Sequence, residues 1–214
     1  MMLRKTITTF AIAAVAAVTL VSCSEQAPLR PDATAAAPSS SAAASPSAAL
    51  TTQSAASRDS VDVHMLPSFA VVPGSSSMLV RNDNGVTGTV HTDGLTAGNA
   101  YTMWFVVFNN PGACVGGCGA DDLGRAGVQA SVVFGTGHVV GGEGNNFAGW
   151  LGVGDTDGAI SGPGLLHPRT AEIHLIIRNH GAAIPGLIDE QISSFNGGCP
   201  PNTCGNVQAA AHMP

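Results

Sequence analysis

Four cysteines in the second half of the chain are well suited to chemistry, because a thiol can form a disulfide, bind a metal or act as a nucleophile. They form two short motifs, CVGGC from Cys114 to Cys118 and CPPNTC from Cys199 to Cys204. An even number of cysteines indicates disulfides when a protein is exported, and the N-terminal segment described below predicts export. We expect the local pairs Cys114–Cys118 and Cys199–Cys204, because each pair shares one turn-prone loop rich in Gly or Pro.

Two other arrangements of these cysteines stay open. A crossed pairing would clamp the loop after the apolar run that ends at Phe108 to the loop near the C-terminus. The spacings also suit a four-cysteine zinc site, which an oxidising compartment disfavours. Neither motif is the Cys-x-x-Cys of thioredoxin-like catalysts, so support for a redox role is weak.

A histidine and a carboxylate alternate along the predicted strand Ala171–Arg178. Extended geometry puts Glu172 and His174 on one face, about 6.6 Å apart. We expect a hydrogen bond between them on a polar outer face; the alternative is a zinc or copper site. His180 falls on the same face but roughly 20 Å from His174, so these two histidines do not form a local chelate. Further ligands would have to come from His138, His167 or His212.

Two acidic stretches raise the possibility of calcium, which prefers oxygen ligands in loops. They are Asp155-Thr156-Asp157-Gly158 and Asp121-Asp122. The first lacks the later Gly and the closing Glu of an EF-hand loop. We therefore expect turn-forming aspartates, with no cofactor required.

No catalytic signature names a nucleophile. The chain has no Gly-x-Ser-x-Gly, no Walker loop and no His-Glu-x-x-His. The Gly-rich run 135–144 is followed by no clear helix, so it does not fit a dinucleotide-binding turn. A triad assembled from distant residues would leave no such motif, so a hydrolase stays open.

Residues 1–23 have the order of a targeting segment: basic Arg4 and Lys5, an apolar stretch Thr6–Leu20, and then Leu20-Val21-Ser22-Cys23. This ending resembles the lipobox of bacterial lipoproteins. The resemblance implies that Cys23 is lipidated, for example with palmitate, and becomes the new N-terminus. Ser24 in place of Asp implies sorting to the outer membrane of a diderm bacterium. The acyl chains would anchor the protein without a spanning helix; the alternative is an ordinary secretory signal.

Residues 24–57 are dominated by Ala, Ser and Pro and contain no aromatic residue. Such a segment cannot bury enough apolar surface to offset the entropy of ordering. We expect a disordered tether whose ends lie roughly 30–35 Å apart, with local helix in the Ala-rich patches as the alternative.

Residues 58–214 are expected to form one domain. It contains no Lys, and acidic residues outnumber its five Arg by about two to one. Nucleic-acid binding needs a basic footprint, so this composition argues against it. It argues equally against an electrostatic attachment to anionic lipid.

Many short apolar runs separated by turn dipeptides predict an all-β antiparallel sandwich, immunoglobulin-like or related. The one plausible helix lies at 187–195, where a strand reading is nearly as good. The expected strands are Val61–Met65, Phe69–Val72, Met78–Arg81, Val86–Thr92, Tyr101–Phe108, Val128–Phe134, His138–Val140, Asn146–Val153, Ala171–Arg178 and Val207–His212.

The pattern Leu95-x-x-Gly98-x-x-Tyr101 precedes the longest apolar run. It resembles the tyrosine corner of immunoglobulin-like and fibronectin type III sandwiches, which implies a bond from the Tyr101 hydroxyl to backbone upstream. An ordinary hairpin is the alternative. The run Tyr101–Phe108 is apolar on both faces, which predicts a central strand with Trp104 in the core. The whole domain vaguely resembles exported bacterial domains of undetermined activity, a resemblance that implies no function.

Three functional readings follow. The first is a lipid-anchored, non-catalytic envelope domain that binds an unknown ligand or partner through loops, with Asn109–Gly127 as the candidate surface. The second is a metal-binding envelope protein that uses Glu172 and His174. The third is a hydrolase without a recognisable motif.

Overall fold

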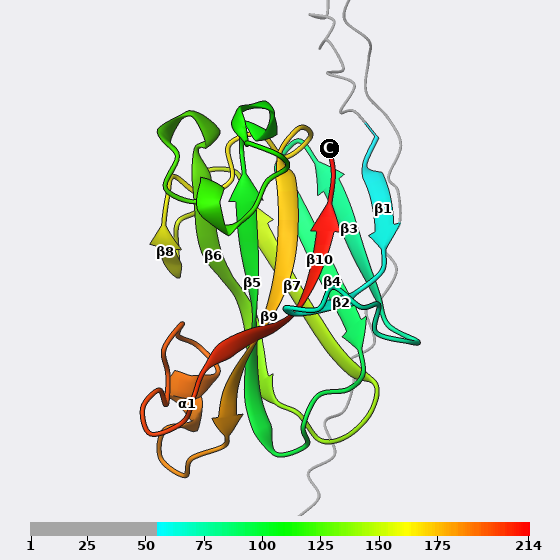
Figure 1. Cartoon of the computed structure of the whole chain (residues 1–214). Coiled ribbons are helices and arrows are strands. Elements are labelled where there is room, and N and C mark those ends of the chain that lie inside the picture. The colour runs from blue at the N-terminus through cyan, green and yellow to red at the C-terminus, as the bar shows by residue number, and fades with distance from the viewer. Residues whose placement is uncertain (1–54) are drawn as a thin grey trace, which may run out of the picture. The chain divides into compact units, whose positions relative to one another are not determined.

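The computed structural model describes residues 55–214, which form two antiparallel β-sheets packed face to face (Figure 1). The predicted signal segment, Cys23 and nearly all of the predicted tether lie outside the described residues. The predicted all-β sandwich with one short helix is confirmed. Strand β1 begins at Ser57, one residue before the expected start of the domain.

One sheet has four strands in the order β1-β3-β4-β7, and the other has six in the order β2-β10-β9-β5-β6-β8. The first sheet comprises β1 (Ser57–Val61), β3 (Ser76–Asn82), β4 (Gly85–Thr92) and β7 (Asn145–Gly152). The second comprises β2 (His64–Met65), β5 (Asn99–Phe108), β6 (Ala130–Val139), β8 (Ala159–Ser161), β9 (Glu172–Ala182) and β10 (Gly205–His212). The helical pieces are η1 (Pro111–Ala113), η2 (Ala120–Asp122), η3 (Ala126–Val128) and α1 (Ile188–Gln191).

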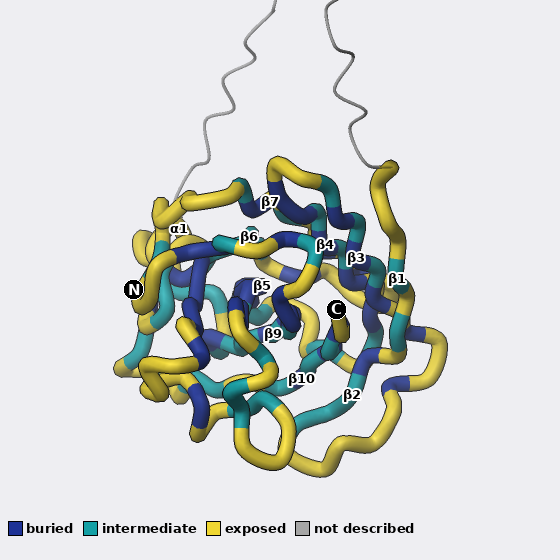
Figure 2. Tube along the Cα trace, turned by 90° about the horizontal axis from the view of Figure 1, so that it is seen from above, coloured by how far each residue is buried: buried dark blue, intermediate teal, exposed yellow. Residues whose placement is uncertain are grey.

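Strand β5 is central, as its apolar pattern predicts, and pairs with β6 on one side and β9 on the other. Its side chains alternate between the two faces of the sheet. Tyr101, Met103, Phe105 and Val107 point into the core between the sheets. Phe108 belongs instead to a smaller cluster on the outer face. Seen from above, the buried positions gather on the strands, while the surrounding loops are mostly exposed (Figure 2).

The corner before β5 has the hydrogen bond that its sequence pattern implies. The backbone N–H of Thr96 donates to the Tyr101 hydroxyl oxygen at 3.0 Å. Gly98 adopts φ +81°, a conformation that favours glycine, and its N–H donates to the Val140 carbonyl at 2.9 Å. Leu95 packs against the edge of the core. The corner therefore fixes the entry of the chain into its central strand.

Replacing Tyr101 by Phe tests this corner. The change keeps the buried ring, which is 2% exposed, and removes only the acceptor for the Thr96 N–H. We expect the free energy of unfolding to fall by about 1 kcal/mol, measured by urea denaturation. Thr96 is exposed, so water can replace part of the lost bond. A loss above about 3 kcal/mol would instead mean that the ring itself had been displaced.

Several expected strand boundaries were wrong, each for a tertiary reason. The run Val61–Met65 is not one strand, because the chain leaves the four-stranded sheet after β1 and joins the six-stranded sheet at β2, with Val63 buried between them. Phe69–Val72 makes only one isolated bridge, between His64 and Val71.

Three further elements differ from the sequence prediction. Most of the expected strands Val128–Phe134 and His138–Val140 belongs to one strand, β6. Its pairing with β5 shifts register at Gly135 and then continues. The short edge strand β8 gives little pattern to recognise and was not foreseen. The helix α1 lies within the predicted 187–195 but is only four residues long.

Candidate functional site

The outer face of the six-stranded sheet carries two adjoining cavities, of about 180 Å³ and about 110 Å³, which together we call the sheet-face groove. They share the side chains of Val106, Leu123, Ile176 and Asn206. The larger cavity is completed by Trp104, Val132, Ile160, Ser161 and Phe195. The smaller one is completed by Phe108, Gly119, Ala120 and His174.

The floor of the groove is apolar because β5 has apolar residues on both faces. Val106 lies on the outward face of β5 beside His174 of β9, and Trp104 lies opposite Ile176. Figure 1 shows the segment that carries η1 to η3 over one end of this sheet and the segment around α1 over the other. The groove therefore lies between two loop regions, on a rigid sheet.

The wall formed by Leu123 belongs to the loop that the sequence singles out as a contact surface, Asn109–Gly127. The disulfide Cys114–Cys118 closes part of this loop. The carboxylate of Asp122 accepts hydrogen bonds from the N–H groups of Val115 at 3.3 Å and Gly119 at 3.2 Å. Leu123 is thus presented by a cross-linked and hydrogen-bonded loop.

The charge of Asp122 helps to hold this loop. Burial raises the pKa of Asp122, but the hydrogen bonds from Arg125, Val115 and Gly119 outweigh it and bring the pKa below its usual value. The Arg125 guanidinium lies 3.0 Å from the carboxylate. The loop is therefore built around an ionised Asp122 at neutral pH.

The opposite wall is formed by Phe195, which follows α1. The Arg178 guanidinium lies 3.9 Å from the centre of the Phe195 ring, and its Nε donates to the Phe195 carbonyl at 2.8 Å. Trp104 packs edge-on between Phe134 and Phe195. Its Nε1–H donates to the Thr102 hydroxyl at 2.7 Å. Trp104 is 2% exposed, so it is buried as predicted, but it lies on the outer face of the sheet and not in the cluster between the sheets.

A polar pair lies at the other end of the groove. The Nε2 of His174 is 2.7 Å from the Glu172 carboxylate, which is the hydrogen bond expected from the strand spacing. The Glu172 carboxylate accepts a hydrogen bond from Nε2–H, so a neutral ring carries its lone pair on Nδ1. Within residues 55–214 the structure records no hydrogen bond to this Nδ1. In its neutral form, His174 therefore offers the groove an acceptor, beside the edge of the Phe108 ring.

Among residues 55–214, no third His, Cys, Asp or Glu side chain joins this pair to complete a metal site. Among the described residues, the one close group of three His, Cys, Asp or Glu side chains is His180, Cys199 and Cys204. The proposed partner His138 stacks on Phe147 at 4.3 Å between ring centres. His212 is bonded to Asp59 and Ser77. Glu172 and His174 thus act here as a hydrogen-bonded pair.

The acidic stretches form turns. The Asp155 carboxylate accepts the backbone N–H of Asp157 at 2.9 Å, a side-chain turn that aspartate commonly makes. Asp122 is committed to the loop bonds described above, and Asp121 is exposed. These contacts commit Asp155 and Asp122 to bonds within their own loops.

A serine, a histidine and a carboxylate in the sandwich are hydrogen-bonded in series, as in the triad of a serine hydrolase. No sequence motif indicates this arrangement. Ser77 Oγ lies 2.8 Å from His212 Nε2, and His212 Nδ1 lies 2.8 Å from Asp59. However, Ser77 is 1% exposed and His212 is 0% exposed. The hydroxyl also lies 3.0 Å from the Thr89 carbonyl, which competes for its proton. A substrate cannot reach this serine, so the triad joins the two sheets rather than performing catalysis.

Because His212 is buried, we expect the protein to lose stability in mild acid. Burial lowers the pKa of His212, although Asp59 raises it; Arg81 and His174 lower it further. The unfolded chain, with a pKa of about 6.5, therefore binds the proton first. We expect the free energy of unfolding to fall as the pH drops below about 6.5, and the slope to be smaller in His212→Gln. Urea denaturation between pH 5 and 8 measures both slopes, and equal slopes would contradict this role for His212.

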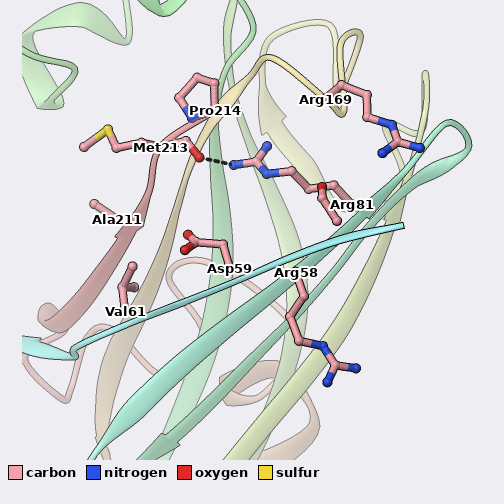
Figure 3. A pocket seen from close by; sticks show the side chains of 9 residues that line it. Arg58, Asp59, Val61, Arg81, Arg169, Ala211, Met213 and Pro214 are labelled. Atoms are coloured by element: carbon pink, nitrogen blue, oxygen red, sulfur yellow. Dashed lines mark hydrogen bonds between the residues drawn. The ribbon is translucent and has the colours of Figure 1, made fainter. Parts of the chain in front are cut away.

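A third cavity, of about 370 Å³, lies at the open edge between β1 and β10 (Figure 3). It contains three of the five arginines of the domain, Arg58, Arg81 and Arg169. Figure 3 shows Arg58 and Arg169 pointing away from Arg81. The side chains therefore do not converge on one point, as an anion site would require.

The guanidinium of Arg81 is buried and forms hydrogen bonds within the fold. Its N–H groups donate to four carbonyl oxygens at 2.7–3.1 Å, those of Pro168, Ala171, His212 and Met213. Burial lowers the pKa of Arg81, and the nearby Asp59 opposes that shift. Arg81 thus ties β3 to the start of β9 and the end of β10.

Both cysteine motifs form the local disulfides expected from their spacing. The Cα atoms are 5.0 Å apart in Cys114–Cys118 and 6.0 Å apart in Cys199–Cys204, within the normal range. The second pair lies beside His180, which is 0% exposed. No local sequence pattern indicates this contact, because it forms only when the loop that carries both cysteines folds back onto the end of β9.

None of the helices within residues 55–214 has the length and apolar character needed to span a bilayer. Comparison of the chain with protein-family models, with curated proteins and with solved structures found no match. We therefore infer a function from the geometry of the groove, which is lined mainly by apolar side chains and has His174 at one end.

Proposed function

We propose that the β-sandwich is a non-catalytic binding domain of a lipid-anchored envelope protein, and that the sheet-face groove binds a small, uncharged, mostly apolar molecule with one hydrogen-bond donor. The observation that carries the proposal is the pairing of an apolar floor with the imidazole of His174, which Glu172 orients at one end of the groove. Ligand pockets are typically apolar with a few placed polar groups. This one is small, so it suits a compact ligand.

The lining of the groove excludes ions more than it excludes apolar molecules. Apart from His174, no titratable side chain lines either cavity. A charged ligand would lose hydration without gaining an ionic partner, which is costly. An apolar ligand would gain about 25 cal/mol for each Å² of apolar surface removed from water. The ligand's donor would face His174 Nδ1.

The envelope location rests on the resemblance of Leu20–Cys23 to a lipobox. Lipidation of Cys23 would hold the binding domain at the outer membrane through the tether 24–57. Labelling cells with a palmitate analogue tests this directly. We expect label on the wild-type chain and none on Cys23→Ser; label on both would reject Cys23 as the lipid site.

A titration with 1-octanol, followed by backbone amide NMR, tests the groove. We expect saturable shifts at Val106, Ile176 and Leu123. Ile176→Gln introduces an amide into the floor and should abolish the saturation. The matched control is Val80→Gln, which changes a half-buried valine on the outer face of the other sheet. Equal binding by wild type and Ile176→Gln would overturn the proposal.

Comparing 1-octanol with its methyl ether distinguishes the contribution of the His174 acceptor to binding from that of the apolar floor. The ether has a similar chain but no donor for His174, so we expect about tenfold weaker binding. Equal affinities for the alcohol and the ether would mean that His174 Nδ1 takes no part in recognition.

A further inference from the structure

His180 lies beside the disulfide Cys199–Cys204 at the end of β9, away from the Glu172–His174 pair of the groove. Its imidazole is held at both nitrogens. Nε2 lies 2.8 Å from the Thr102 hydroxyl, and Nδ1 lies 3.0 Å from the Gly197 carbonyl. The ring is 0% exposed, whereas both cysteines are half-buried. A buried and oriented nitrogen thus lies beside two sulfurs that solvent can reach.

The distances are those of metal ligands. Nδ1 lies 3.9 Å from Cys199 Sγ and 3.8 Å from Cys204 Sγ. Metal–nitrogen bonds near 2.0 Å and metal–sulfur bonds near 2.3 Å place nitrogen and sulfur about 3.6–3.8 Å apart. The distance to Cys204 Sγ lies at the upper end of that range, and the distance to Cys199 Sγ lies just beyond it. Only the sulfur–sulfur bond has to open to create a three-ligand site.

The loop around the site is held by bonds that do not depend on the disulfide. The Asn202 side chain donates to the carbonyls of His180 and Ala182, each at 2.8 Å. The buried Gln191 also donates to these two carbonyls and accepts the Ile184 N–H at 2.8 Å. We therefore expect the loop to keep its position beside β9 when the disulfide is reduced.

We propose that reduction of Cys199–Cys204 creates a Cu(I) site made by His180 Nδ1 and the two cysteine sulfurs. Two molecules of a thiol reductant supply two electrons and two protons, which gives two cysteine thiols and one reductant disulfide. Cu(I) then replaces the two thiol protons, which are released to solvent. The ring binds through the Nδ1 lone pair, and its proton moves to Nε2, facing Thr102.

The donor set favours Cu(I) over other common ions. Two thiolates and one imidazole are soft or borderline ligands, which suit Cu(I) and zinc. Structural zinc almost always takes four protein ligands, and within residues 55–214 no fourth His, Cys, Asp or Glu joins this group. One Cu(I) with two thiolates leaves a net charge of −1. Arg178, whose charge acts on His180, lies close enough to balance it.

The other disulfide supplies a matched control. Cys114 and Cys118 are separated by a similar span of chain. Within the described residues, no histidine joins them in a three-ligand group. Reduced Cys114–Cys118 therefore offers sulfur alone, whereas reduced Cys199–Cys204 offers sulfur and an oriented nitrogen.

The experiment compares two variants of the full chain, Cys114→Ser/Cys118→Ser and Cys199→Ser/Cys204→Ser. Each is reduced anaerobically with a phosphine, which is then removed, and titrated with Cu(I) against a chromophoric chelator. We expect the variant that keeps Cys199 and Cys204 to bind one Cu(I) at least about tenfold more tightly. X-ray absorption of that complex should show one nitrogen and two sulfur ligands.

Adding His180→Asn to the variant that keeps Cys199 and Cys204 removes the nitrogen while leaving both thiols. We expect its affinity to fall to that of the Cys114–Cys118 pair and the nitrogen ligand to disappear from the spectrum. Circular dichroism checks that the sheet is retained. Equal Cu(I) affinities for the two cysteine pairs, a complex without nitrogen, or binding of Zn²⁺ but not Cu(I) would each overturn the proposal.

Discussion

Replacing Arg81 by Ala is expected to lower the free energy of unfolding by about 3–5 kcal/mol. The guanidinium donates to four carbonyl oxygens from two separate segments. Its removal leaves these carbonyls without their donor at the edge of the sandwich. Unfilled buried acceptors cost about 1–3 kcal/mol each, and those that water can reach cost less. Urea denaturation at neutral pH measures the loss.

Two further variants test the reason for this loss. Arg81→Lys keeps the positive charge but lacks the planar fork that reaches four acceptors, so it should recover less than half of the lost stability. Arg58→Ala removes an exposed arginine from neighbouring β1 and should change stability by less than about 0.5 kcal/mol. Full stability in Arg81→Lys would show that charge, rather than the four hydrogen bonds, matters.

The second large effect is expected at Phe105, whose ring lies at the centre of the core and is 0% exposed. A Cβ atom added at Gly88, Gly135 or Gly149 would lie only 2.9–3.1 Å from this ring. These three strand glycines thus make the space that the ring fills. Phe105→Ala should cost about 3–5 kcal/mol through lost burial and a cavity.

A double-mutant cycle with Gly88 tests this packing. Gly88→Ala alone should cost about 1–3 kcal/mol, because its methyl group would press on Phe105 and Leu175. In combination with Phe105→Ala, the added methyl group enters the space that the ring vacates, so the double variant should lose less than the sum of the single losses. Additive losses, measured by urea denaturation, would contradict this account of the glycines.

The local sequence pattern was enough to predict those features of the fold whose contacting residues are close together in the sequence. The central strand followed from apolar side chains on both faces, and the corner from Leu95, Gly98 and Tyr101. The bond between Glu172 and His174 followed from strand spacing alone. The two local disulfides are likewise closed within short loops.

Features that depend on distant pairing were missed. Ser77 and His212 are separated by 135 positions, so no motif could indicate their contact. The crossing between the sheets at Val63 looked like the interior of one strand. Glycine is usually a turn residue, whereas Gly88, Gly135 and Gly149 lie in strands and pack on Phe105. The groove combines side chains from several segments between Trp104 and Asn206, and none of them has a distinctive local pattern.

The nitrogen chemical shifts of the His174 ring, measured by long-range ¹H–¹⁵N NMR with and without 1-octanol, test the binding account most directly. When the ring is neutral, we expect the free protein to carry the proton on Nε2, bonded to Glu172, and a lone pair on Nδ1. Saturation with 1-octanol should shift Nδ1 as it accepts the hydroxyl proton, while the methyl ether should leave it unchanged. A ring protonated on Nδ1, or an Nδ1 shift that does not respond to the alcohol, would contradict the proposed function.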